Sequence, residues 1–184
     1  VLSGGSAFGL ESTCGVSKYL EENNIGFDVG VAKVPIVVGA VLFDLGVGNP
    51  KSRPNIEMGY RACQVASDTK LNQGNFGAGC GATVGKIKGI EYAMKGGIGS
   101  HSIKLPNGLV VSALVAVNAF GDVYENGKVI AGVMDDEKKN VLNSYELMKN
   151  GVNKGGFSID NTTIGIVATN AKLDKAGCKK VSQM

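Results

Sequence analysis

Two adjacent threonines, placed directly before an apolar segment, offer the clearest chemistry in this sequence. Thr162 and Thr163 follow Asn161 and precede residues 164–168, whose β-branched content is typical of a strand. From this position the Thr162 hydroxyl can attack the peptide bond that precedes it, which would leave Thr162 as a new N-terminus. The α-amine of an N-terminal residue has a pKa of about 7.7 to 8.0, and it can deprotonate the hydroxyl of the same threonine. Thr162 is therefore a candidate nucleophile that needs no histidine.

The chain has few other groups of the kind that usually act in catalysis. It contains one histidine, His101, and no tryptophan. His101 has no acid at a spacing that would orient it as a general base, so we interpret it as a loop histidine. A structural interpretation stays open for the threonine pair as well, because β-branched residues often begin strands.

Five segments spread over nearly the whole chain resemble a known family. Residues 1–10 read VLSGGSAFGL, residues 34–37 read VPIV, residues 74–86 read GNFGAGCGATVGK, residues 117–123 read VNAFGDV and residues 167–171 read VATNA. Together they resemble the self-processing aminopeptidases of peptidase family S58, which include L-aminopeptidase/D-esterases and β-peptidyl aminopeptidases. Thr162 stands six residues before Ala168, the start of Ala-Thr-Asn-Ala. The related ornithine acetyltransferase has its cleavage threonine at the same spacing from Ala-Thr-Asp-Ala.

The resemblance implies a self-cleaving aminopeptidase with three active-site residues in this chain. Thr162 becomes the N-terminal nucleophile after cleavage of the bond to Asn161, and it then hydrolyses short peptides, amides or esters through an acyl-enzyme. Asn118 matches the asparagine that donates to the oxyanion, although a strand-end asparagine is more commonly a turn former. Tyr60 matches a tyrosine that binds the substrate amine or assists proton transfer, although a helix tyrosine packed on the core is an equal alternative. No metal or organic cofactor is implied.

The resemblance leaves two alternative functions open. An acyltransferase of the ornithine acetyltransferase type would use the same acyl-threonine with an amine acceptor. A non-catalytic member would keep the fold without cleavage. The best-known aminopeptidases of the family have serine where this chain has Thr162, and the added methyl group would narrow the range of substrates or favour a different acceptor.

The fold implied by the resemblance is α/β, a four-layer α/β/β/α sandwich of the N-terminal-nucleophile type. Its protomers are processed and assemble as a homo-oligomer, a tetramer. We expect a single domain over residues 1–184, in which residues 1–161 belong to the larger subunit and residues 162–184 begin the smaller one. Because the sequence begins at Val1 and the family extends beyond both ends, we interpret the chain as a fragment of a longer protein.

The pattern of apolar residues predicts the elements that would carry these groups. Near-continuous apolar residues predict a strand over residues 109–117 that is covered on both faces and ends at Asn118. Pro54 and Asn55 predict the start and cap of a helix that contains Tyr60. Three further elements are expected: a helix over residues 10–24, one or two buried strands over 34–45, and a helix in the second half of 135–149.

Composition argues against several other classes of function. The 184 residues are 43% hydrophobic and 19% charged with a net charge of +3, and no segment interleaves basic with aromatic residues as a nucleic-acid surface does. The glycine-rich residues 74–86 lack the spacing of a P-loop or of a dinucleotide site, so we expect them to form a tight wall near the active site. Nucleic acids and nucleotides are therefore not expected partners.

Cysteine usage and hydropathy indicate the expected compartment. The cysteines have neither the spacing of zinc ligands nor that of a disulfide framework, and they are Cys14, Cys63, Cys80 and Cys178. No apolar run reaches the roughly 20 residues of a membrane helix. We therefore expect a cytoplasmic protein with reduced thiols and no membrane association.

Overall fold

The computed structural model describes residues 1–69, 71–152 and 161–184. Its helices are α1 (Ser12–Glu22), α2 (Ile56–Gln64), α3 (Ser144–Lys149) and α4 (Lys175–Ser182), with short 3-10 helices at Ser6–Glu11, Gly77–Gly79 and Ile90–Tyr92. Its strands are β1 (Leu2–Ser3), β2 (Phe27–Asp28), β3 (Lys33–Val34), β4 (Ala40–Val41), β5 (Thr83–Val84), β6 (Met94–Lys95), β7 (Gly97–Lys104), β8 (Val110–Asn118), β9 (Val123–Glu125), β10 (Lys128–Ala131) and β11 (Thr162–Thr169). The prediction of a mixed α/β fold is confirmed.

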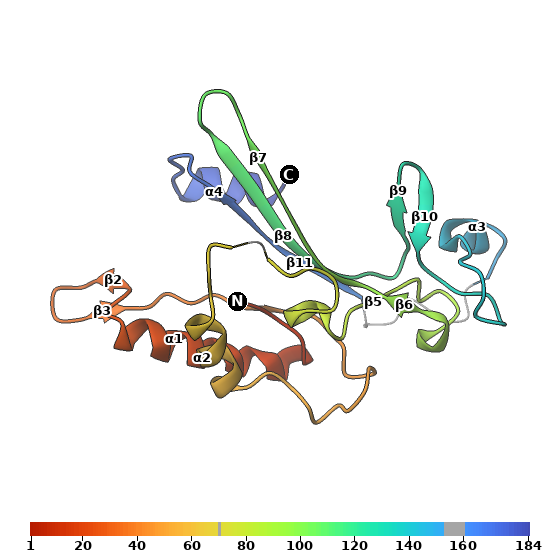
Figure 1. Ribbon diagram of the computed structural model, residues 1–184, viewed down its shortest axis with the longest axis horizontal. Coiled ribbons are helices and arrows are strands. Elements are labelled where there is room, and N and C mark those ends of the chain that lie inside the picture. The colour runs from red at the N-terminus through yellow and green to blue at the C-terminus, as the bar shows by residue number, and fades with distance from the viewer. Residues whose placement is uncertain (70, 153–160) are drawn as a thin grey trace.

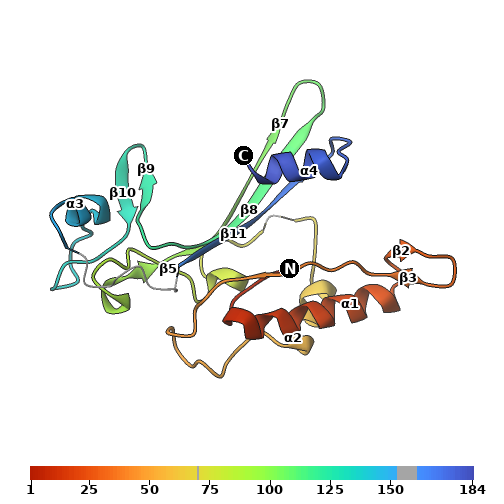
Figure 2. The same cartoon turned by 180° about the vertical axis from the view of Figure 1, so that it is seen from behind.

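The largest described sheet has the strand order β11-β8-β7. Figure 1 shows α1, α2 and the β2–β3 hairpin to one side of this sheet, and β9, β10 and α3 beyond one of its ends. Figure 2, seen from behind, shows α4 beside the other end of the sheet. The three long strands therefore have a helical part, with α1 and α2, to one side and a second part, with β9, β10 and α3, beyond one end.

β8 is the central strand and pairs antiparallel with both β7 and β11. The register sets Thr162 opposite Asn118 at one end of β11 and Thr169 opposite Val111 at the other. The predicted strands that begin at Thr162 and end at Asn118 are both confirmed. The predicted coverage of β8 holds at one end only, because Val111 is 40% exposed whereas Ala116 and Asn118 are fully buried.

The core lies against the end of β8 that carries Asn118. Ala116 packs there with other buried residues, namely Leu42, Ala78 and Ala82, and with Leu2, Ile98 and Ile164 around them. Three of the four residues of this cluster are alanines, and backbones approach one another closely here. A Cβ on Gly79 would lie 2.4 Å from the Gly74 carbonyl oxygen and 2.6 Å from the Ile98 nitrogen. The glycine-rich segment therefore packs as tightly as the sequence predicts, and its place in the wall of an active site stays a prediction.

α1 and α2 pack with their backbones in close contact. A Cβ on Gly15 would lie 1.9 Å from the Ile56 carbonyl oxygen, and Gly59 makes a similar approach in the opposite direction. α2 begins as predicted after Asn55, whose side chain accepts a hydrogen bond from an amide of the first turn and caps the helix. The predicted helix over residues 10–24 is confirmed, with a 3-10 turn before α1.

Residues 34–45 differ from the predicted buried strands. The only strand residues in this described range are Val34, at the end of β3, and the two residues of β4, and Ile36 and Val38 are 75% and 78% exposed. Pro35 has no amide proton for a strand ladder, so it interrupts pairing at this point. Among these described residues Leu42 alone is fully buried. Residues 34–45 are therefore apolar in sequence but do not form a buried strand.

The remaining elements agree with the sequence in part. α3 occupies the second half of residues 135–149, as expected. His101 lies within β7, opposite Ala113, so its interpretation as a loop histidine is wrong. Within the described ranges, no helix combines the length and the apolarity needed to cross a membrane.

Candidate active site

Thr162 and Asn118 face each other across the β8–β11 pair. Thr162 begins β11, Asn118 ends β8, and the two are direct partners in the antiparallel register. Directly opposed residues place their side chains on the same face of a sheet, with Cβ atoms about 4.5 to 5.5 Å apart. Asn118 is fully buried and Thr162 is half-buried. The structure thus brings together the residues predicted as nucleophile and as oxyanion donor.

The same register separates Thr162 from its neighbour Thr163. Thr163 pairs with Val117 and is exposed. Because successive side chains of a strand alternate between its two faces, Thr163 lies on the face opposite to that of Thr162 and Asn118. Of the two threonines, Thr162 is therefore the one that shares a face of the sheet with Asn118.

The peptide bond that would be cleaved lies at the edge of the described structure. Asn161 is half-buried and directly precedes β11. The segment expected to lead into it, with Gly155, Gly156 and Asp160, lies outside the described residues. The approach of the Thr162 hydroxyl to the Asn161 carbonyl therefore stays a prediction.

Hydrogen bonds hold the Asn118 side chain in one orientation. Its Oδ1 accepts from the Thr83 amide at 3.0 Å and from Lys86 Nζ at 2.8 Å. Its Nδ2 donates to the Phe43 carbonyl oxygen at 2.7 Å. Donors surround one end of the amide and an acceptor meets the other, so the partners define which atom is oxygen and which is nitrogen. The donor end of Asn118 is therefore fixed in place without a substrate.

Lys86 belongs to this site, although the sequence reasoning missed it. It is 5% exposed, and its Nζ donates to the side-chain and backbone oxygens of Asn118 at 2.8 and 3.2 Å. A hydrogen bond to the oxygen of an amide polarises that amide and makes its N–H groups better donors, so the bond from Lys86 Nζ to Asn118 Oδ1 is suited to strengthen the Nδ2 donor. The sequence offered one signal for Lys86, its position at the end of the glycine-rich residues 74–86. Its partner Asn118 lies 32 residues further along the chain, so the sequence did not connect the two residues.

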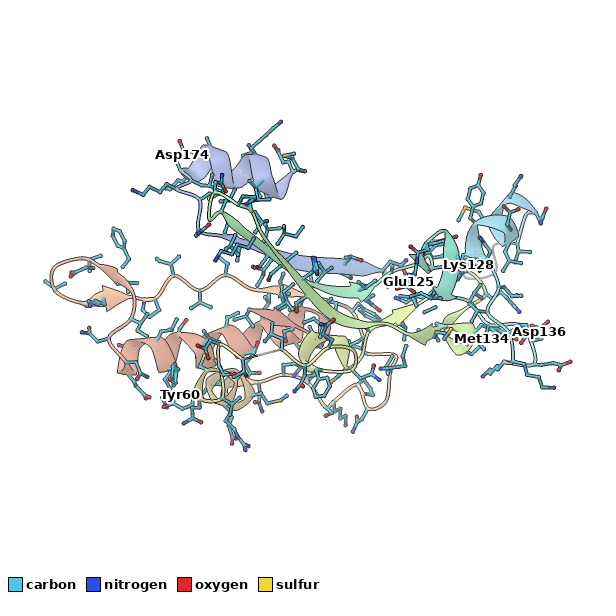
Figure 3. All side chains as sticks on the ribbon, turned by 45° about the horizontal axis from the view of Figure 1, so that its top comes forward. Tyr60, Glu125, Lys128, Met134, Asp136 and Asp174 are labelled. Atoms are coloured by element: carbon cyan, nitrogen blue, oxygen red, sulfur yellow. The ribbon has the colours of Figure 1, made fainter. Side chains whose placement is uncertain are left out.

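Tyr60 lies with the helices rather than with Thr162 and Asn118. Its hydroxyl donates to Glu22 Oε2 at 2.5 Å, and its ring meets that of Tyr19 edge-on at a centroid distance of 5.5 Å. Figure 3 shows Tyr60 among the side chains of α1 and α2. The hydrogen bond to Glu22 raises the pKa of Tyr60 above its ordinary value of 10.0, because the carboxylate stabilises the protonated phenol. A catalytic role for Tyr60 stays a prediction.

A cavity of about 420 Å³ opens beside the loop that supports Asn118. Its walls include Ser3, Gly4, Asp44, Arg53, Met58 and Cys80. Asp44 directly follows Phe43, the residue whose carbonyl holds the Asn118 amide. The Asp44 carboxylate accepts from the Gly5 amide at 2.6 Å and occupies the space that a side chain on Gly4 would fill. The cavity is therefore a candidate for the part of the site that holds a substrate.

Comparison with known proteins connects this arrangement with a family. The model of peptidase family S58 matches residues 1–184. An uncharacterized aminopeptidase of Mycobacterium leprae is 41% identical over 192 residues, which cover 99% of this chain and 51% of the relative. An uncharacterized aminopeptidase of Mycobacterium tuberculosis is 36% identical over 189 residues, which cover 99% of this chain and 53% of the relative. A 6-aminohexanoate-oligomer endohydrolase of Kocuria sp. is 26% identical over 181 residues, which cover 94% of this chain and 49% of the relative. The chain spans about half the length of these curated relatives.

Proposed function

The chain belongs to peptidase family S58, and from that premise we propose that it is part of a self-processing hydrolase of peptide bonds. The observation that carries the proposal is the register of β11 on β8, which sets Thr162 opposite the buried Asn118. In this arrangement a hydroxyl nucleophile and an amide donor can act on one carbonyl group. The names of the relatives, aminopeptidase and endohydrolase, support the same type of reaction.

Self-processing would use the Thr162 hydroxyl against the carbonyl carbon of Asn161. The hydroxyl oxygen forms a bond to that carbon, the C–N bond to the Thr162 nitrogen breaks, and the nitrogen takes up a proton. Water hydrolyses the resulting ester, which restores the hydroxyl and leaves a carboxyl group on Asn161. Thr162 then carries both the nucleophile and the α-amine that serves as its base.

Peptide hydrolysis would follow with the same nucleophile. The α-amine accepts the hydroxyl proton as the Thr162 oxygen attacks the substrate, and negative charge develops on the substrate carbonyl oxygen. Asn118 Nδ2 donates to this oxyanion, and Lys86 strengthens the donor through its bond to Asn118 Oδ1. The leaving amine takes the proton, and water hydrolyses the acyl-threonine. One such donor stabilises the transition state by about 3 kcal/mol.

The proposed substrates are short peptides, amino-acyl amides or esters that carry a free amino group. The cavity beside Asp44 adjoins the loop that holds Asn118, although neither Thr162 nor Asn118 is among the residues that line it. The Kocuria relative is named for oligomers of 6-aminohexanoate. Short amide-linked oligomers of that kind therefore belong among the substrates to be assayed.

For the whole protein we propose the architecture that the family resemblance implies. It is a four-layer α/β/β/α sandwich in a cytoplasmic homo-oligomer of processed protomers, with β7, β8 and β11 in one of its two central sheets. The support is the exposure of apolar side chains on β11, where Ile166 is 44% and Val167 is 51% exposed. A sheet face of this kind is normally covered by a further layer.

Separate replacement of the two threonines tests the proposed function. Thr162→Ala should abolish self-cleavage and hydrolysis of an amino-acyl amide, whereas Thr163→Ala should retain both because Thr163 lies on the other face. Thr162→Ser should still cleave, since it keeps the hydroxyl. The readouts are the intact mass and the initial rate of the full-length protein. Wild-type cleavage or turnover in Thr162→Ala would contradict the proposal, and transfer to an added amine in place of hydrolysis would identify an acyltransferase.

A further inference from the structure

We propose that Thr169 and Asn170 set the register that brings Thr162, rather than Thr163, opposite Asn118. We call Thr169 and Asn170 the register clamp. The proposal rests on the proposed role of Thr162 as the nucleophile. The register clamp lies at the far end of β11 and does not touch the reacting atoms, so its members are positioning residues.

The register clamp binds the start of β8 through side-chain hydrogen bonds. Asn170 Oδ1 accepts from the Val110 amide at 2.8 Å, and Asn170 Nδ2 donates to the Gly108 carbonyl oxygen at 3.0 Å. Thr169 Oγ1 donates to the Val110 carbonyl oxygen at 2.8 Å and accepts from the Ala171 amide at 3.1 Å. Both backbone groups of Val110, and the turn before it, are thereby tied to the end of β11.

Apolar burial specifies the register of β11 only in part, through Ile164, which packs against the core around Ala116. A strand with a single buried face resists a slip of one residue, because the slip would bring that face into water. Beyond Ile164, the described part of the chain leaves apolar side chains of β11 exposed on both faces, as Ile166 and Val167 show at 44% and 51% exposure. Backbone ladder bonds form in a shifted register as well as in the observed one. The directional bonds of the register clamp add to the discrimination that the burial of Ile164 provides.

A slip of one residue has a chemical consequence here because the two threonines are adjacent. It would set Thr163 opposite Asn118 and turn Thr162 to the other face. β11 pairs with β8 continuously from Thr162 to Thr169, so the position of one end determines the position of the other. The register clamp therefore acts on a site about 24 Å away along the strand.

The test compares Asn170→Ala with Asn107→Ala in the full-length protein. Asn107 lies in the same turn between β7 and β8, where its Oδ1 accepts from the Leu109 amide at 3.1 Å. That bond stays within the turn and does not reach β11, which makes Asn107→Ala the matched control. The readouts are the rate of self-cleavage, the N-terminal residue of the smaller fragment and the midpoint of thermal unfolding.

Asn170→Ala is expected to cleave about tenfold more slowly than the control, as the loss of one or two hydrogen bonds of ordinary strength would produce. Part of its smaller fragment should begin with Thr163. Asn107→Ala should cleave at the wild-type rate and yield fragments that begin with Thr162. Asn170→Asp keeps the acceptor for the Val110 amide and loses the donor to Gly108, so its rate should lie between the two.

A wild-type rate with Thr162 as the sole new N-terminus in Asn170→Ala would overturn the proposal. Equal slowing in Asn170→Ala and Asn107→Ala, in proportion to their loss of thermal stability, would also overturn it, because a merely structural role predicts that result. If Asn170→Ala does not fold, Asn170→Asp decides: slowed cleavage supports the register clamp, and a wild-type rate rejects it. A wild-type protein that never cleaves refutes the proposed function instead, so the two failures are distinguishable.

Discussion

The two ends of the β8–β11 pair are built differently. At the end that holds Thr162, Asn118 is fully buried and Lys86 is 5% exposed, and the two side chains are hydrogen-bonded to each other. At the far end Val111 is 40% exposed, and Asn170 binds the backbone of β8 at the surface. One continuous pair of strands thus has a buried polar site at one end and a solvent-exposed attachment at the other.

Residues at the buried end act on the charge that develops during the reaction. Residues at the exposed end act on the register of the two strands. A hydrogen bond to a developing charge is stronger where water is excluded, so a donor is most effective at the buried end. A hydrogen bond at the surface stabilises less, yet it can still favour one register over another. Changes at the buried end should therefore slow the chemical step most, and changes at the exposed end should slow it least unless they shift the register.

Of the substitutions that test the difference between the two ends of the strand pair, Asn118→Asp should lower kcat most. Aspartate keeps the shape and the acceptor for Lys86 but removes both N–H donors, so kcat should fall about a hundredfold or more. The new carboxylate would also lie against the Phe43 carbonyl oxygen, so the unfolding midpoint should decrease. Asn143→Asp is the matched control, because Asn143 caps α3 as an acceptor and aspartate caps equally well. If the folded Asn118→Asp protein keeps a near-normal kcat, Asn118 does not act as an oxyanion donor and has only a structural role.

Lys86→Met should have the next largest effect. Methionine fills a similar volume but leaves Asn118 Oδ1 without the Nζ donor that polarises the amide, so we expect kcat to fall about tenfold. Lys88→Met is the control, since the Lys88 side chain is also largely buried but its Nζ binds Asp136 at 2.6 Å. Steady-state kinetics and thermal unfolding should be measured on all three proteins. Reduced stability with unchanged kcat in Lys86→Met would assign Lys86 to the fold alone.

His101→Ala should have the smallest effect. His101 is exposed on β7, on the part of the sheet far from Thr162, and surface changes of this kind alter stability by less than about 0.5 kcal/mol. We expect kcat and the rate of self-cleavage to stay within about twofold of wild type. A large loss of either rate would break the distinction between the two ends of the strands.

The extent to which the site was predictable depends on the distance along the chain between its parts. Local patterns predicted the strand that begins at Thr162 and the strand that ends at Asn118, because such signals arise within a few residues. The partners of Asn118 were not predictable in this way: Thr83, Lys86 and Phe43 lie 35, 32 and 75 residues away. The register that pairs Thr162 with Asn118 likewise depends on two strands separated by α3.

Prediction from local sequence patterns has the same limit in the helical part of the molecule, α1 and α2. The cap at Asn55 was predictable from neighbouring residues, and the helix that contains Tyr60 was found. The direction of the Tyr60 side chain depends on Glu22, which is 38 residues away. The exposure of Ile36 and Val38 was not predictable from hydropathy, because exposed apolar residues are common on protein surfaces.

The proposed mechanism requires Thr162 to be an N-terminus in the mature protein. The most direct test is intact mass analysis of the purified full-length protein, combined with N-terminal sequencing of its smaller component. We expect two polypeptides that purify together, the smaller of which begins with Thr162. A folded protein that remains one uncleaved chain, or a smaller polypeptide that begins at another residue, would contradict it.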